Sequence, residues 1–535
     1  MPVFAHTFLT VLKEDGLSPS QELGSDIECY FDRLPFELIA YIFELGQPLQ
    51  PSPAVFDTLE FGKILNQHES PQAFRFVLGS VCRKWKDIAW ATPCLWSVLV
   101  LQLPFVPARS LRGWLDRSRG HSLYIQIELM DLQLASGKIF TPIFEILGTG
   151  SHLSRCRTLQ VHLPTHLIRG LLPLRQPAAA MDVLLIYPLD YSGSGHLDNY
   201  KSVSNSIGGD VQGPSPTVFT IAALCPFDFG IAWGNMMHFK GTVISMQDVI
   251  QILQQSPQML TFEVEAVVVQ SASVSHVIHL SLISMSARNV ALNFWDYLTL
   301  PALQELESPL CSDGQFQSLH GFMLRSGCAL LTLTLGGYRI KDDIIVLLAM
   351  QSSLVSLSLQ AVFNTHLSEF FFQALGQTDR IGDQVAEQRF LPILRELTIT
   401  AYGTSILNHL PLVWVHRPQS EDRRFYRPLL EVNIGIRHFE NSESVNGDDE
   451  GTILDLQRVQ TLFKFSPYAN CQGPHFSIME DFDSHLRDDV LLRSYRHHAT
   501  ELFADLDGMQ KLVLFGDQLV LERRWGELID LKRLY

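Results

Sequence analysis

The densest group of side chains able to ligate a metal ion lies near the carboxyl end of the chain. It comprises His475, Glu480, Asp481, Asp483 and His485. Imidazole and carboxylate groups are common ligands of divalent ions. This group has no cysteine and no repeated spacing, and acidic clusters with histidine are common on solvated charged surfaces. We therefore expect no metal site here.

Two further histidine pairs also lack the geometry of a shared site. His276 and His279 lie in the apolar stretch VSHVIHL, where strand alternation would separate their faces. His497 and His498 are adjacent, so their side chains diverge on a helix. We interpret the first pair as core or edge histidines.

The common signatures of catalysis are absent from the sequence. It contains no G-x-x-x-x-G-K-[ST], no G-x-G-x-x-G, no G-x-S-x-G and no H-E-x-x-H. We expect no enzyme activity, no catalytic residue and no cofactor. An unrecognised enzyme is the least favoured alternative, kept because motif searches miss unfamiliar sites.

Composition limits the class of protein and its partners. The 535 residues are 46% hydrophobic and 18% charged, enough for three to four domain-sized cores. The net charge of −16 repels phosphate backbones and acidic bilayers. We therefore expect neither nucleic acid nor membrane as a partner.

Targeting signals are also missing. The first residues, MPVFAHTFLTVLKEDG, form a poor signal peptide, and the longest apolar stretches are far shorter than a membrane span. Eight cysteines form no C-x-x-C pair, and no N-x-[ST] sequon occurs. These features predict a soluble intracellular protein, cytoplasmic or nuclear.

A short helical module is predicted near the amino end. Pro35 suits a first helical position, Glu37 favours the first turn, and Gly46 is a plausible stop. A proline-bearing loop is expected at about 47–71. Apolar residues then recur at helical spacing up to Thr92-Pro93: Phe74, Val77, Leu78, Val81, Cys82, Trp85, Ile88 and Ala89.

These segments resemble an F-box. The first reads L-P-x-E-L-I-x-x-I-F, and the second reads V-C-R-x-W-x-x-I-A-x-x-T-P-x-L-W-S. The form with a proline-rich insertion is similar to the F-box proteins abundant in mushroom-forming fungi. The resemblance covers about 65 residues and implies docking on the Skp adaptor of a Skp–cullin–F-box ubiquitin ligase.

The resemblance assigns the docking residues by position. They are Leu34, Pro35, Leu38, Ile39 and Ile42 in the first segment, and Val81, Cys82, Trp85, Leu95 and Trp96 in the second. A module this small cannot bury its tryptophans and its Leu/Ile stripe alone, which is consistent with a partner. Alternatively, Trp90 or Trp96 seals the module against the next domain. A local excess of basic residues from Pro71 to Val100 suits an acidic partner surface.

The rest of the chain shows the L-x-x-L-x-L spacing of leucine-rich repeats. Alternating Leu123, Ile125 and Ile127 precede it and predict a strand. The matches begin at Cys156, Met259, Val277, Leu330, Leu354, Leu394, Leu429 and Met509, with a partial one at Leu303. Between them, Ser245 and Asp248 resemble a capping box ahead of a helix, and further helices are expected at Phe316–Leu324 and Lys341–Ala349.

These patterns predict an α/β chain with a small all-helical F-box module followed by an irregular leucine-rich-repeat-like solenoid. The expected divisions are a tail at 1–30, the F-box at 31–100 and the array at 101–535, with loops at about 189–216 and 439–451. The acidic loop at 439–451 is interpreted as solvated, with recognition of basic substrates as the alternative. A mixed α/β domain is the rival architecture for the array.

The leading functional hypothesis is a substrate-recognition subunit of a ubiquitin ligase. The F-box would dock on the Skp adaptor and through it on a cullin, and the array would hold a target protein. The alternative is an interaction scaffold that never enters a ligase.

Overall fold

The computed structural model divides into two compact units, Met1–Gly241 and Thr242–Tyr535, each described by itself. The structure describes residues 33–46, 71–103, 105–129, 137–149, 152–171, 181–189, 213–222, 224–268, 275–310, 312–337, 344–363, 369–376, 390–402, 431–437, 475–481, 511–515 and 518–523. Every structural statement below concerns these residues.

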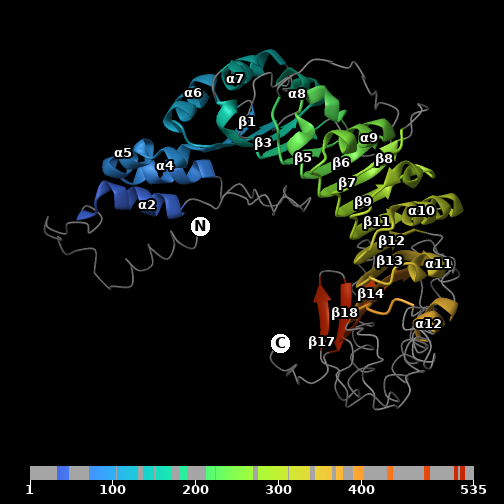
Figure 1. Cartoon of the computed structure of the whole chain (residues 1–535). Helices are drawn as coiled ribbons and strands as arrows, with labels where there is room; N and C mark the ends of the chain where they lie inside the picture. Colours follow the sequence, from blue (N-terminus) through green and yellow to red (C-terminus); the bar gives the residue numbers. More distant parts are fainter. Residues whose placement is uncertain are drawn as a thin grey trace, which may run out of the picture. The chain divides into compact units, whose positions relative to one another are not determined.

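Helices come first in the described part of the first unit (Figure 1). They are α2 (Phe36–Gly46), α4 (Pro71–Val81) and α5 (Arg83–Ala91), followed by the 3-10 turn η4 (Pro93–Trp96). The periodicity from Phe74 to Ala89 is divided between α4 and α5, because Cys82 adopts an extended backbone between them. The expected boundaries at Gly46 and Thr92 are confirmed.

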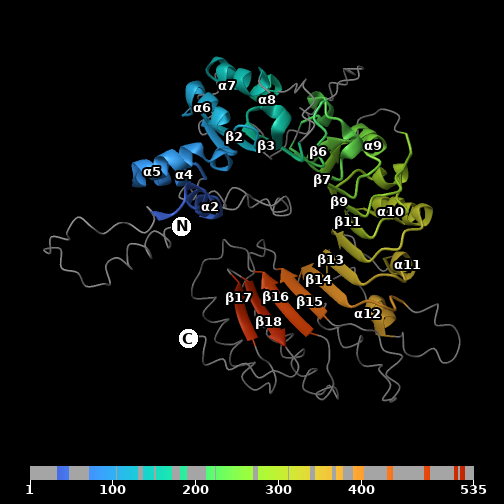
Figure 2. The same cartoon turned by 60° about the vertical axis from the view of Figure 1, so that its left-hand side comes forward.

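Six strands follow in the first unit and pair in parallel in chain order. They are β1 (Val98–Leu103), β2 (Leu123–Leu129), β3 (Cys156–Leu163), β4 (Val183–Pro188), β5 (Val218–Ile221) and β6 (His238–Ser245), whose last residues cross the unit boundary. Between them lie α6 (Ala108–Arg117), α7 (Gly137–Thr149), η6 (Leu153–Arg155), α8 (Thr165–Leu171), η8 (Pro226–Phe229) and η9 (Trp233–Asn235). Helices α6, α7 and α8 lie together on one side of β1–β3 (Figures 1 and 2).

Alternation along the strands places their apolar residues in one buried row. The row crosses all six strands through Leu99, Ile125, Leu159, Leu184, Phe219 and Phe239, and each is at most 1% exposed. In β2, where buried and partly exposed residues alternate, a one-residue slip would move the apolar side chains to the opposite face, whereas β1 and β4 are buried on both faces.

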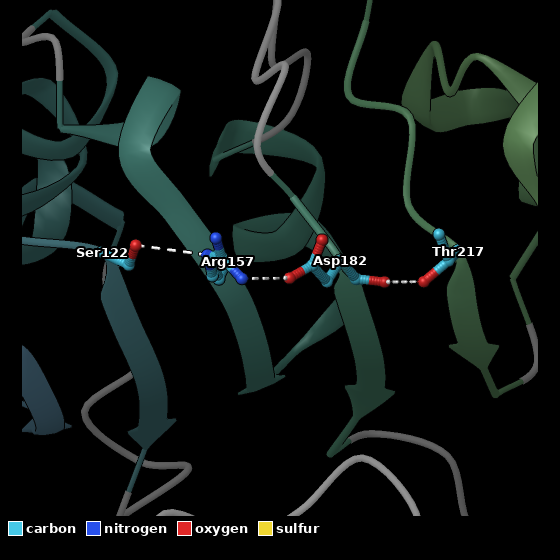
Figure 3. A network of polar contacts seen from close by, with 4 residues as sticks. All are labelled: Ser122, Arg157, Asp182 and Thr217. Carbon is cyan, nitrogen blue, oxygen red and sulfur yellow. Dashed lines mark hydrogen bonds and ion pairs between the residues drawn. The ribbon is translucent and has the colours of Figure 1, made fainter.

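A polar ladder joins the amino ends of four of these strands (Figure 3). Arg157 Nε donates to Ser122 Oγ at 3.2 Å, and its Nη1 lies 3.3 Å from Asp182 Oδ2. Thr217 Oγ1 donates to the backbone oxygen of Asp182 at 3.0 Å. The Arg157–Asp182 ion pair is half exposed, so its contribution to stability is small, typically below about 1 kcal/mol.

The strands of the second unit are also mainly parallel. Their order is β7 (Thr261–Val268), β9 (Ser284–Asn289), β11 (Glu305–Pro309), β12 (Thr332–Gly336), β13 (Ser356–Phe363), β14 (Glu396–Tyr402), β15 (Glu431–Arg437), β16 (His475–Asp481), β18 (Gln518–Arg523) and β17 (Lys511–Phe515). Only the pairings of β18 with β16 and β17 are antiparallel among these strands. The short strands β8 (Val277–Ile278) and β10 (Leu298–Thr299) form a separate pair.

The helices of this unit are α9 (Met246–Gln255), α10 (Asp313–Ser326), α11 (Ile344–Ala349) and α12 (Glu369–Gly376), with the 3-10 turn η10 (Phe294–Tyr297). Helices α10, α11 and α12 lie along one side of the strands (Figures 1 and 2). The expected cap of α9 is present, because Ser245 Oγ accepts a hydrogen bond from the Asp248 amide at 3.1 Å and donates to its carboxylate at 2.7 Å.

The expected strand at Leu123–Ile127 is confirmed as part of β2. The last two positions of most apolar triplets also fall on strands, including those in β3, β7, β11, β12, β13, β14, β15 and β17. The triplet beginning at Val277 is the exception, because β8 ends at Ile278 and Leu280 is exposed. The helices expected at Phe316–Leu324 and Lys341–Ala349 are found within α10 and as α11.

The expected fold class is wrong, although the α/β character is correct. A small all-helical module followed by a solenoid is not observed, because α2, α4 and α5 belong to the same compact unit as β1–β6. Arg75 of α4 donates to the backbone oxygens of Leu95 and Val98, which ties that helix to the start of β1. The rival interpretation, a mixed α/β architecture, describes the chain better.

The loops expected at about 47–71 and 439–451 lie outside the described residues, apart from Pro71, the first residue of α4. Most of the loop expected at 189–216 also lies outside them; only Leu189 and residues 213–216 are described.

Candidate docking surface

The three amino-terminal helices share one small core. Its buried residues come from all of them and from η4: Ile39, Phe43, Leu78, Ile88, Ala89, Leu95 and Trp96. Trp85 packs edge-on against Phe43, with ring centroids 5.0 Å apart. Cys94 of η4 donates its thiol hydrogen to Glu44 Oε1 of α2 at 3.0 Å, and burial together with this bond raises the pKa of the thiol to about 12.

Helix α2 is apolar on two faces, but its core contact uses only one of them. Ile39 and Phe43 are buried and four residues apart, so they form the inner stripe. A second apolar stripe follows the spacing i, i+3, i+4 and i+7 and is exposed; it consists of Leu38, Tyr41, Ile42 and Leu45. Leu38 is 50% exposed and Leu45 is 67% exposed. The described residues of the chain therefore leave the outer stripe of α2 largely uncovered.

Helix α4 carries a shorter stripe of the same kind. Val77 and Val81 are four residues apart, and both are more than half exposed. Phe76 is partly exposed, while its ring lies within 6.4 Å of the rings of Trp90 and Trp96, counted between centroids. We call the outer stripe of α2, together with Val77 and Val81, the apolar face.

Cys82 and Trp85 lie where α4 ends and α5 begins. Cys82 is exposed, and its sulfur accepts a hydrogen bond from the Trp85 amide at 3.4 Å, which caps α5. Trp85 is half-buried against Phe43. The extended backbone at Cys82 separates α4 from α5 and so determines where the side chains of Cys82 and Trp85 lie.

The predicted docking residues divide into three groups. Pro35, Leu38, Ile42, Val81 and Cys82 are exposed. Leu34 and Trp85 are half-buried against the core.

Ile39, Leu95 and Trp96 form the third group, and they are a correction. All three are at most 1% exposed and cannot present their side chains to a partner. Trp96 is held inside by a hydrogen bond from Nε1 to the Ala89 backbone oxygen at 2.9 Å. Of the two alternatives for this residue, sealing within the chain is therefore correct. Ile39 is turned inward because it shares the stripe of Phe43.

Tyr41, Leu45 and Val77 belong to the apolar face but were not among the expected docking residues. The signal was present in the sequence, because Leu38, Tyr41, Ile42 and Leu45 form a second stripe at helical spacing beside the one that includes Ile39 and Phe43. A helix of eleven residues with two apolar stripes needs cover on both sides.

A buried arginine lies behind the aromatic side chains of this region. Arg75 is fully buried, and its guanidinium carbon lies 4.6 Å from the centroid of the Trp96 ring and 5.1 Å from that of Trp114. Nη1 donates to Leu95 O at 3.2 Å, whereas Nε and Nη2 make no hydrogen bond. Burial, and secondarily the charge of Arg117, lowers the pKa of Arg75 to about 10.

Across the residues that the structure describes, no three His, Cys, Asp or Glu side chains are grouped as metal ligands. The histidine interpretation is confirmed for His279, which is buried and hydrogen-bonded to Ser256 O and the Leu282 amide, whereas His276 is exposed. Burial raises the pKa of the Cys156 thiol to about 12, so it stays protonated near neutral pH.

One cavity of about 360 Å³ lies at the end of α6. Its lining consists of Leu115, Asp116, Arg119, Gly120, His152, Ser154 and Arg155. Arg155 donates from this wall to the backbone oxygens of Leu115 and His121, both at 3.0 Å. This guanidinium therefore closes the carboxyl end of α6, which is a structural role.

No protein-family model matches the chain, and no curated protein was found to be similar to it in sequence. The resemblance to an F-box therefore depends on the residues quoted above. Across the described helices, none combines the length and the apolar character needed to cross a bilayer.

Proposed function

We propose that this chain is a substrate-recognition subunit of a Skp–cullin–F-box ubiquitin ligase and that the apolar face docks on the Skp adaptor. One observation carries the proposal: helix α2 exposes the apolar stripe of Leu38, Tyr41, Ile42 and Leu45 while its other stripe is already buried. Large exposed apolar patches on soluble domains mark interaction sites.

The energetics favour a binding role for this stripe. Fully burying an exposed leucine or isoleucine side chain gains about 1.5–3 kcal/mol, and covering Leu38 and Ile42, which are 50% and 42% exposed, would gain roughly half of that for each. The residues of the stripe already lie on a helix that is fixed by Ile39 and Phe43, so little conformational entropy is lost on binding. A preformed helix face of this kind suits tight, specific docking.

Target capture would then act through proximity. The chain would hold a target protein close to the reactive thioester of the ligase and raise the effective concentration of its lysines. We assign no chemical step to this chain. A ligase subunit of this type would work in the cytoplasm or the nucleus, which is part of the same proposal.

The test is the affinity of the full chain for purified Skp adaptor, measured by calorimetry. Leu38→Asp/Ile42→Asp should weaken binding by at least about 100-fold, because burying an unpaired charge adds to the loss of two anchors. Val346→Asp is the matched control, an exposed apolar residue on α11 of the second unit. It should leave the affinity unchanged.

Equal affinity of wild type and the Leu38/Ile42 variant would refute docking through the apolar face. Ligase and scaffold are separated by a second measurement, cullin association and target ubiquitination in a reconstituted system. An adaptor complex that never recruits the cullin would leave the scaffold interpretation standing and end the ligase proposal.

A further inference from the structure

Positive charge is concentrated on α5 and α6 of the first unit. Between Pro71 and His121 the sequence has eight basic residues and only two acidic ones, Asp87 and Asp116, in a chain whose net charge is −16. The basic residues are Arg75, Arg83, Lys84, Lys86, Arg109, Arg112, Arg117 and Arg119. The net charge of this segment is therefore positive, whereas the net charge of the whole chain is negative.

The two helices meet at one tryptophan. Lys86 Nζ of α5 lies 5.8 Å from the centroid of the Trp90 ring, and the guanidinium carbon of Arg117 of α6 lies 5.9 Å from it. Arg83, Lys86, Arg109 and Arg112 are exposed. We call these four residues together with Arg117 the basic surface.

A buried positive charge lies beside the basic surface. The Arg117 guanidinium carbon is 5.0 Å from the centroid of the Trp96 ring, and that of the buried Arg75 is 4.6 Å from the same centroid. Nε and Nη2 of Arg75 have no hydrogen-bond partner. Two cations near one ring repel each other, and an anion bound at the surface would offset this repulsion.

We propose that the basic surface binds an acidic segment of a protein partner other than the Skp adaptor. Clusters of arginine commonly recognise acidic motifs. An acidic peptide can contact these basic residues locally, whereas a nucleic acid or a bilayer carries negative charge over its whole extent and would be repelled by the rest of a chain whose net charge is −16.

The position of the surface separates this partner from the adaptor. Arg109 and Arg112 lie on α6, beyond the segment that resembles an F-box, which ends at about residue 100. The apolar face lies on α2 and α4. The inference therefore goes beyond the proposed function and stands without it.

The experiment measures fluorescence anisotropy of a labelled decaglutamate peptide with the full chain. We expect binding that weakens at least about tenfold when the salt concentration rises from about 0.05 M to about 0.3 M. Arg109→Glu/Arg112→Glu should weaken it by about tenfold or more, because two attractions become repulsions. Arg395→Glu, an exposed arginine in front of β14, is the matched control and should change affinity less than about twofold.

Three outcomes would overturn the inference. One is equal loss of affinity in the Arg395 control and the α6 variant. Another is tighter binding of a ten-nucleotide single strand, or of phosphatidylserine vesicles, than of decaglutamate. The third is displacement of decaglutamate by saturating Skp adaptor, which would assign the surface to the adaptor. The Leu38→Asp/Ile42→Asp variant should bind decaglutamate as tightly as wild type does. This control separates the basic surface from the proposed adaptor contact.

Discussion

Helices α2 and α9 are of similar length, but their apolar residues are covered to different extents. In α9 every apolar side chain is buried: Met246, Val249, Ile250, Ile252 and Leu253. In α2 only Ile39 and Phe43 are fully covered, and four large apolar residues remain on the outer stripe. Helix α9 is completed by its own unit, whereas α2 has an apolar side that another molecule can complete.

A matched pair of substitutions tests this comparison most directly. Ile252 of α9 is fully buried, and Ile42 of α2 is 42% exposed. Ile252→Asp should destabilise the second unit by more than about 4 kcal/mol, because it creates a cavity and buries an unpaired charge. Ile42→Asp should cost less than about 1 kcal/mol. Urea unfolding followed by circular dichroism measures both, and equal losses would remove the distinction between the helices.

The pKa of His162 tests whether side chains on the strands of the first unit are shielded from water, as the apolar side chains of α9 are. His162 of β3 stacks on Tyr187 of β4, with ring centroids 4.8 Å apart, and burial lowers its pKa to about 4 from 6.5. The unfolded chain therefore binds a proton below pH 6.5, whereas the folded unit binds it only below about 4. The stabilising contribution is complete above pH 6.5 and is lost as the pH falls toward 4.

We expect His162→Gln to remove part of this acid sensitivity, on the order of 2 kcal/mol between pH 6.5 and 4. The check is the difference in unfolding free energy between wild type and variant across that range. If the unfolding free energies of wild type and variant changed equally with pH, His162 would be accessible to water. The side chains around it would then be less shielded than the apolar side chains of α9.

The smallest effect is expected where exposed groups are polar and already paired with each other. Arg157→Ala and Asp182→Ala should each cost less than about 1 kcal/mol, and the coupling in their double-mutant cycle should be about 0.5 kcal/mol and fall with salt. A coupling above about 2 kcal/mol would mean that the ladder in Figure 3 is a main support of the sheet.

Prediction from the sequence worked best where burial leaves a periodic pattern. The triplets that include Leu333, Leu357 and Leu397 fall on neighbouring strands and pair in register, because each strand buries alternate residues. The cap at Ser245 was equally readable, since it needs only local residues. The strands that carry these triplets and the start of α9 were therefore predictable, whereas β1, β4, β5 and β6 were not among the expected strands.

The docking residues were only partly predictable. Leu38 and Ile42 are exposed as expected, but Ile39 is buried, because a stripe pattern cannot say which of two adjacent apolar rows faces the core. Leu95 and Trp96, in the turn η4, are buried by contacts with other segments. Trp96 packs near Trp90 at 5.2 Å between centroids, a contact between segments that local periodicity does not encode.

The sequence by itself determined the alternation of strands and helices, the charge contrast between residues 71–121 and the rest of the chain, and the presence of two apolar rows on α2. Only the tertiary structure decided that α2, α4 and α5 join the unit of β1–β6. It also decided which row of α2 stays exposed and that Arg75 is buried among tryptophans. Periodicity follows from neighbours along the chain, whereas burial depends on which distant segments pack against a given face.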